Sequence, residues 1–224
     1  MIRVRVSADI FLTMTQDDSF NITGHLAGCD DKLARLIKKI GSPKIEKLAS
    51  DPFAALVRSI TSQQLNGDAA KTIFNRLKES ADNNISPATL SRLSHETLSA
   101  LGLSRAKASC ILELAQKTAE GTIDVTPENL MLQSDEEIIK NLCVVKGIGP
   151  WTVHMLLLFQ LQRKDVWPVT DFGVRKGYGL AWQTEMPTAK QLEAIGDKFK
   201  PYRSLVAWYC WRAIDLKDDP DYIV

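Results

Sequence analysis

The chain has few of the residues that build metal centres or disulfide frameworks. Its 224 residues include 4 cysteines and 3 histidines, and neither type shows the spacing of a metal site. Scattered cysteines without a disulfide pattern are typical of a reducing compartment. The sequence also lacks an apolar run long enough to span a membrane and the apolar stretch of a signal peptide. We therefore expect no metal, no disulfide and no membrane partner.

A strong charge of one sign is also missing, since 28 Lys and Arg nearly balance 27 Asp and Glu, for a formal net charge of +1. This balance argues against a non-specific, salt-driven binder of nucleic acid. A specific binder would need a local basic face. The composition, with 45% hydrophobic and 25% charged residues, is that of a globular protein of one or two domains.

Helical patterns dominate the sequence, with serine or threonine at several starts and glycine at several ends. The segment Ile2–Val6 instead alternates like a short strand. We expect an all-α fold that follows an N-terminal extension over residues 1–22. The helices are expected near 30–40, 52–64, 67–79, 87–93, 95–101, 104–120, 127–132, 135–145, 150–162, 171–179, 188–199 and 201–214.

A glycine hairpin, Gly147-Ile148-Gly149, separates two of these helices. The run Ser134–Glu137 forms a capping box that starts the first helix, and Pro150 suits the first turn of the second. The second helix would point its unpaired N–H groups at the hairpin, where they favour a phosphate, and Lys146 adds a cation. The alternative is an ordinary turn between two helices.

Asp171 is a lone carboxylate that follows a Trp-Pro break about twenty residues after the hairpin. A carboxylate in a low-dielectric cleft can stabilise the positive charge that develops on a deoxyribose when its N-glycosidic bond breaks. The position also suits the N-cap of a helix. Both interpretations can hold, because a cap fixes the side chain that catalysis needs.

The segments Leu142–Val153 and Val169–Lys176 resemble the helix-hairpin-helix and the Pro-x-x-Asp segment of the helix-hairpin-helix DNA glycosylase superfamily. Three further stretches are similar to its 3-methyladenine DNA glycosylase II (AlkA) type, in the same order along about residues 24 to 215: 51–64, 101–107 and 202–212. One departure is Thr170, where the family often has a second acidic residue. The resemblance implies a two-lobed helical fold over residues 23–224, with a DNA cleft between a central lobe near 58–165 and a second lobe from 23–57 and 166–224.

The resemblance implies a monofunctional enzyme of base excision repair that flips alkylated purines, such as 3-methyladenine and 7-methylguanine, out of double-stranded DNA and hydrolyses their N-glycosidic bond. The resemblance implies that Asp171 is the catalytic residue. Glycosylases that also cut the strand carry a lysine where this chain has Trp151, so no lyase activity is expected. The alternatives are a non-hydrolytic binder of damaged or abasic DNA and a glycosylase for another lesion, such as uracil.

Further residues receive candidate roles in DNA binding. Phosphate contacts are expected from the hairpin with Lys146 and Thr152, and from a second turn with Ser104 and Lys107. The alternative for Lys107 is a solvated surface lysine. Either Leu65 or Asn66 could enter the minor groove as a wedge, although Leu65 also suits a core position at a helix turn.

The resemblance places Trp151 and Trp211 in the pocket for the flipped base, where aromatic faces attract a cationic base. At least one of Trp208, Tyr209 and Trp211 must be a core residue, since they share a helix. No cofactor is expected, apart from a structural monovalent cation that the hairpin could hold. We expect a monomer in the nucleus of a eukaryote or the cytoplasm of a prokaryote.

Overall fold

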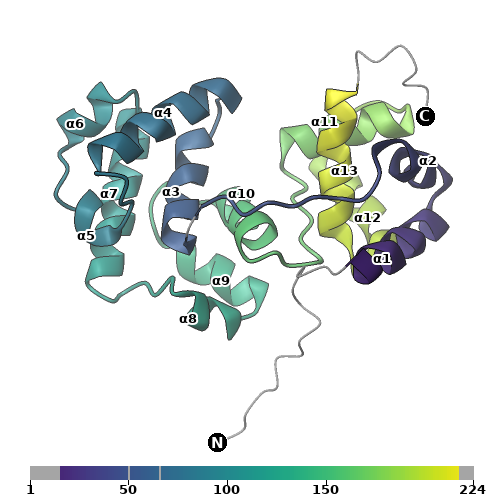
Figure 1. Ribbon diagram of the computed structural model, residues 1–224, viewed down its shortest axis with the longest axis horizontal. Helices are drawn as coiled ribbons and strands as arrows, with labels where there is room; N and C mark the ends of the chain where they lie inside the picture. Colours follow the sequence, from purple (N-terminus) through teal and green to yellow (C-terminus); the bar gives the residue numbers. More distant parts are fainter. Residues whose placement is uncertain (1–15, 50, 66, 217–224) are drawn as a thin grey trace, which may run out of the picture. The chain divides into compact units, whose positions relative to one another are not determined.

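The computed structural model describes residues 16–49, 51–65 and 67–216, with side chains from residue 21 onward (Figure 1). All elements in this part of the chain are helices, which confirms the expected all-α class. They are α1 (Gln16–Cys29), α2 (Asp31–Ile40), α3 (Pro52–Ser62), α4 (Gly67–Ser80), α5 (Pro87–Leu90), α6 (His95–Ala100), α7 (Arg105–Ala119), α8 (Pro127–Met131), α9 (Asp135–Leu142), α10 (Pro150–Met155), the π-helix η2 (Leu156–Gln160), α11 (Phe172–Trp182), α12 (Ala189–Gly196), the 3₁₀-helix η3 (Asp197–Phe199) and α13 (Arg203–Asp215). None of them is long and apolar enough to cross a bilayer.

The structure departs from the expected helices at several places. The helix expected over 188–199 is divided into α12 and the 3₁₀-helix η3, and the helix expected over 135–145 ends at Leu142. Helix α1 was not expected, because its apolar residues form no clear stripe and Gly24 and Gly28 interrupt it. It is held instead by packing, with Ile22 and Leu26 buried. The helix expected over 150–162 is divided into α10 and the π-helix η2. The strand expected over 2–6 lies outside the described residues.

Side-chain caps begin the helices where the sequence predicted them. The Asp51 carboxylate accepts from the Ala54 N–H at 2.9 Å and begins α3. In the capping box of α9, the Ser134 hydroxyl accepts from the Glu137 N–H at 3.2 Å, and the Glu137 carboxylate accepts from the Ser134 N–H at 2.7 Å. The same exchange begins α12. These local signals explain why the helix starts could be predicted closely.

The chain folds as two compact units, Lys47–Leu161 and the combination of Met1–Glu46 with Gln162–Val224. We call them the central unit and the terminal unit. The lobe boundary expected near residue 58 would divide α3, whereas the whole of this helix belongs to the central unit.

Helix α3 forms much of the core of the central unit. Leu56, Val57 and Ile60 have no exposed surface, and among the residues of α3 only Arg58 is exposed. A helix that is apolar nearly all round must be covered on most sides. Helices α4, α7, α10 and η2 pack against it.

In the terminal unit, α11 packs along α13 (Figure 1). Their backbones approach closely at Gly177, where an added Cβ would lie 1.8 Å from the Cys210 carbonyl oxygen. Phe199 and Tyr209 are fully buried, and the Tyr209 hydroxyl donates to the Gly41 carbonyl at 2.9 Å. This packing makes α11 a rigid support for the residue that begins it.

Candidate active site

The glycine hairpin between α9 and α10 has the geometry that the sequence predicted. Gly147 has a φ of 102°, and a Cβ there would lie 3.1 Å from the buried Cys110 side chain, so only glycine fits without strain. Gly149 is the N-cap of α10, with no side-chain cap, and Pro150 follows in the first turn. Within the described part of the chain, the backbone N–H groups of Gly147 and Gly149 donate to no acceptor. The exposed Lys146 adds positive charge beside them.

A residue to which the sequence analysis gave no role, Gln63, supports this hairpin. Its side-chain amide donates to the Gly147 carbonyl at 3.0 Å and to the Thr152 hydroxyl at 2.9 Å. Gln63 ends α3, so these bonds tie the hairpin to the core helix of the central unit. Gln63 lies in the stretch 51–64 that resembles the family, but its partner 84 positions away could not be identified from sequence.

The structure corrects the expectation for Thr152. Its side chain is 1% exposed, its hydroxyl is bonded to Gln63, and its N–H donates to the Gly149 carbonyl at 3.0 Å. Both polar groups therefore have protein partners. Thr152 holds the hairpin together, and a direct phosphate contact has no support.

Lys107 is neither a solvated lysine nor placed as a phosphate contact. Its ammonium donates to the Thr61 and Gln63 carbonyls, at 2.8 and 2.7 Å, at the C-terminal end of α3. Burial lowers the pKa of this lysine. A cation at the negative end of a helix is favourable, which offsets its position in the first turn of α7. Ser104 begins α7 by accepting from the Lys107 N–H at 3.3 Å, and its phosphate contact stays a prediction.

In the terminal unit, Asp171 is the N-cap of α11. Its Oδ1 atom accepts from the Val174 N–H at 2.7 Å, and the residue is 8% exposed. The positive end of the helix dipole stabilises a carboxylate at this position. Asp171 is therefore fixed in orientation and largely removed from bulk water, as a carboxylate that acts electrostatically should be.

Trp211 on α13 is a second donor to this carboxylate. Its indole N–H lies 2.9 Å from Oδ1 of Asp171. The side chain of Trp211 is half-buried. Tyr209 on the same helix is fully buried, so it is the core residue that was expected among Trp208, Tyr209 and Trp211. The pocket role expected of Trp211 stays a prediction, and the structure adds a direct bond to the candidate catalytic residue.

Gly173 makes room for this pair, which the sequence analysis did not anticipate. An added Cβ would lie 2.7 Å from Cδ1 and Nε1 of Trp211 and 3.0 Å from Oδ1 of Asp171. Cys210 also borders the carboxylate. Burial raises the pKa of the Cys210 thiol, and the nearby negative charge of Asp171 raises it further. The thiol therefore stays neutral beside the carboxylate.

The remaining predicted residues lie in the central unit. Leu65 follows the end of α3 and is 40% exposed, so it is a surface residue and not a core residue. Asn66 lies outside the described residues, so the choice between the two wedge candidates stays a prediction. Trp151 is half-buried on α10. Among the described residues, no group of His, Cys, Asp and Glu could hold a metal ion.

The fold and these residues define a class of helical protein with a glycine hairpin between two helices and a capped, largely buried carboxylate. Comparison with known proteins agrees. The family model described as "HhH-GPD superfamily base excision DNA repair protein" matches residues 57–201. The chain belongs to this superfamily.

Several relatives cover most of the chain. It is 36% identical to DNA-3-methyladenine glycosylase 1 of Schizosaccharomyces pombe over 87% of each chain, and 30% identical to the alkylbase DNA glycosidase-like protein of that yeast over 84% of this chain and 90% of that one. Among solved structures, an S. pombe 3-methyladenine DNA glycosylase in complex with abasic DNA has a TM-score of 0.83 at 35% identity, covering 88% of this chain and 98% of that one. A DNA-3-methyladenine glycosidase from Bacillus halodurans has a TM-score of 0.73 at 28% identity, covering 86% and 88%.

Proposed function

We propose that this protein is a monofunctional DNA glycosylase that removes alkylated purines, such as 3-methyladenine and 7-methylguanine, from double-stranded DNA. The superfamily match and the printed names of its relatives support this activity. Relatives solved with DNA support the partner. In the proposed reaction, water forms a new bond to C1′ of the deoxyribose and gives up one proton to solvent, while the base leaves with the electron pair of the N-glycosidic bond.

The observation that carries the proposal is the environment of Asp171. The residue is 8% exposed, and its carboxylate accepts from the Val174 N–H and the Trp211 indole N–H. As the N-glycosidic bond breaks, positive charge develops on the sugar ring, and a fixed carboxylate out of bulk water stabilises it. An alkylated purine is already cationic, so departure with the electron pair neutralises it. One carboxylate can then suffice, unlike the pair of ordinary glycosidases.

The hairpin supplies the second part of the proposal. The N–H groups of Gly147 and Gly149 and the N-terminal end of α10 suit a DNA phosphate, with Lys146 as a nearby cation. Thr152 and Gln63 hold the hairpin from inside the protein. These contacts would fix the strand without reading its sequence.

The absence of lyase activity follows from Trp151. A lyase needs an amine that can form a Schiff base at this position, and an indole nitrogen cannot do so. We therefore expect an abasic site as the product, with the DNA strand intact.

The test is release of free bases from randomly methylated DNA, measured by chromatography with the purified protein. Asp171→Asn should lower the release rate by at least about a hundredfold, as loss of one preorganised electrostatic group does. Asparagine caps helices about as well as aspartate, so the variant should fold and bind an abasic duplex like the parent. An unchanged rate would refute the catalytic assignment. A parent protein that binds damaged DNA without release would instead be the non-hydrolytic binder.

Gly149→Asp is the complementary variant, because it places a negative charge against the expected phosphate. Its affinity for abasic duplex should fall for every flanking sequence, since phosphate contacts carry no sequence information. Parent-like affinity would show that the hairpin does not hold the strand.

A further inference from the structure

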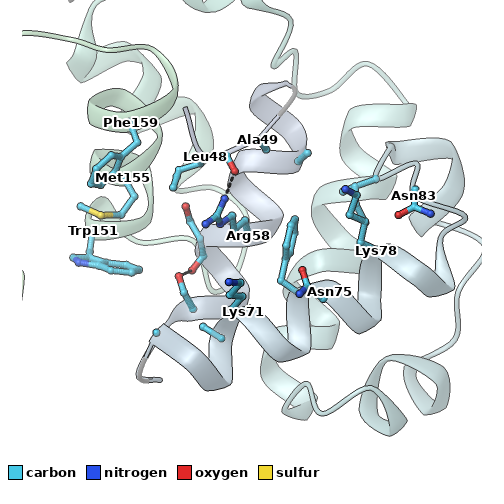
Figure 2. A pocket seen from close by; sticks show the side chains of 17 residues that line it. Leu48, Ala49, Arg58, Lys71, Asn75, Lys78, Asn83, Trp151, Met155 and Phe159 are labelled. Carbon is cyan, nitrogen blue, oxygen red and sulfur yellow. Dashed lines mark hydrogen bonds between the residues drawn. The ribbon is translucent and has the colours of Figure 1, made fainter. Parts of the chain in front are cut away.

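The turn from α3 to α4 contains the two wedge candidates and borders a groove. This groove has a volume of about 670 Å³ and lies between α3, α4 and the α10–η2 segment, with Ser62 and Gly67 of the turn among its lining residues. Figure 2 shows Lys71 of α4 and Trp151 of α10 on opposite sides of it. Because the groove separates α4 from α10 here, other contacts must fix the position of the turn.

The backbone of this turn adopts an uncommon conformation. Gln64 has a φ of 54°, in the left-handed region that residues other than glycine rarely occupy. Gln64 and Leu65 are exposed, and the Leu65 N–H donates to the Ser62 carbonyl at 3.2 Å. A strained conformation persists where the surrounding structure holds it, and such strain is common at functional sites.

Gln63, which precedes the strained residue, connects this turn to the glycine hairpin. Its side-chain amide donates to the Gly147 carbonyl at 3.0 Å and to the Thr152 hydroxyl at 2.9 Å, so both amide hydrogens are used. Its backbone carbonyl accepts from the Lys107 ammonium at 2.7 Å. The hairpin and the end of α3 therefore meet at one residue.

Helix α7 supports the hairpin and the end of α3 with the same face. Lys107 and Cys110 are three residues apart, so their side chains share a face of the helix. The Lys107 ammonium donates to the carbonyls of Thr61 and Gln63. The Cys110 side chain lies against the hairpin, since an added Cβ on Gly147 would be 3.1 Å from its Cβ and Sγ atoms. The bonds of Gln63 thus join two elements that rest on one helix.

We propose that Gln63 is a positioning residue that couples the phosphate-binding hairpin to the wedge turn. A strand held at the hairpin then faces a turn whose place relative to that strand is fixed. Leu65 or Asn66 can fill the gap in the stack as soon as a nucleotide leaves it. The proposal rests on the proposed function, because a wedge serves a protein that flips a nucleotide. It assigns no DNA contact to Gln63 itself.

The test measures single-turnover base release from duplexes that carry one 7-methylguanine, opposite either cytosine or a mispaired adenine. Gln63→Met keeps most of the side-chain volume and removes both amide donors. Release from the paired duplex should fall about tenfold, the effect of losing one or two orienting hydrogen bonds. Release from the mispaired duplex should fall less than about threefold, because a mispaired base leaves the stack at lower cost and depends less on the wedge.

Thr152→Val is the milder variant, because it removes one acceptor of Gln63 and keeps the shape of the side chain. Release from the paired duplex should fall about threefold, since the bond of Gln63 to Gly147 is preserved. The double variant Gln63→Met/Thr152→Val should lose no more than Gln63→Met alone, because residues that act through one bond are not additive. If Gln63→Met fails to fold, the paired-to-mispaired ratio of Thr152→Val decides the test.

Ser86→Ala is the control for a loss of stability without a loss of coupling. Ser86 is the N-cap of α5 in the same unit, and the hydrogen bonds of its hydroxyl are to Thr89. Loss of this cap should lower the thermal unfolding midpoint. At a temperature below the midpoints of all variants, its release rates from the two duplexes should equal those of the parent protein.

A second measurement does not require base release. A duplex with 2-aminopurine beside a tetrahydrofuran abasic analogue reports entry of the wedge through a change in fluorescence. At saturating protein, Gln63→Met should lose most of the change that the parent protein produces, whereas Ser86→Ala should retain it.

Equal losses of Gln63→Met on the paired and mispaired duplexes would overturn the proposal and leave Gln63 with a structural role only. Parent-like release from the paired duplex, or additive losses in the double variant, would also overturn it. A protein that releases no base from methylated DNA, yet loses the 2-aminopurine signal with Gln63→Met, would refute the glycosylase proposal and leave the coupling intact.

Discussion

The indole N–H of Trp211 donates to Oδ1 of Asp171 at 2.9 Å, so one helix orients the carboxylate that begins another. The same oxygen accepts from the Val174 N–H at 2.7 Å. Two donors on one oxygen fix the rotation of the carboxylate as well as its position. A tryptophan at this place can therefore serve the reaction without contacting the substrate.

Trp211→Phe tests this relationship, because it keeps an aromatic ring on α13 and removes the donor. A hydrogen bond to a charged group is worth about 1.5–3 kcal/mol, so the rate of base release should fall about 10- to 100-fold. The loss should appear in kcat more than in KM, since the bond orients a group that acts in the transition state. Single-turnover release from methylated DNA measures it. A change in KM alone would show that the ring binds substrate and does not position Asp171.

Gly173→Ala and Gly177→Ala are a matched pair of substitutions on α11. The first should lower the rate of base release, and the second should lower stability. At Gly173 the new methyl group would collide with Trp211 and approach Oδ1 of Asp171, at 2.7 and 3.0 Å, so catalysis should fall first. At Gly177 it would lie 1.8 Å from the Cys210 carbonyl oxygen and force α11 away from α13. Overpacking of this kind costs about 1–3 kcal/mol, so the unfolding midpoint of that variant should fall. The reverse pattern in activity and thermal unfolding would contradict the assignment.

Two lysines that the sequence could not distinguish should respond differently to the same substitution. Lys107→Met removes a donor to two carbonyls at the end of α3, so the free energy of unfolding should fall by about 1–2 kcal/mol. Lys146→Met leaves an exposed hairpin position, so stability should be unchanged. The salt dependence of its abasic-duplex binding should instead become shallower by about 0.9, the loss of one phosphate contact. Equal salt slopes for the two variants would show that Lys107 also contacts DNA.

The sequence predicts the local features of this structure and does not predict the contacts between residues that are far apart in the chain. Caps such as Ser134 and Asp171 act on N–H groups three residues away, so their helix starts could be predicted from adjacent residues. The glycine hairpin is equally local. The bonds of Gln63 to Gly147, and of Trp211 to Asp171, join residues 84 and 40 positions apart. Such partners depend on how helices pack, which no local pattern specifies.

The buried hydroxyl of Tyr178 should make the free energy of unfolding depend on pH in the alkaline range. Its ring stacks on Trp182 at 4.2 Å between centroids. Burial raises the pKa of Tyr178 to about 12, and the negative charge of Asp30 contributes. The unfolded chain has a tyrosine pKa of about 10 and binds fewer protons than the folded protein between these values. The contribution of Tyr178 to the free energy of unfolding should therefore be constant below pH of about 10 and fall as pH rises towards about 12.

Tyr178→Phe is the variant that isolates this effect, because it preserves the stacking ring and removes the proton. Denaturant unfolding at a series of alkaline pH values should show a shallower decline for this variant than for the parent protein. The decline should not vanish, since burial also raises the pKa of Tyr209. Identical slopes for parent and variant would mean that the Tyr178 hydroxyl is solvated in the folded protein and that its ring alone contributes to the core.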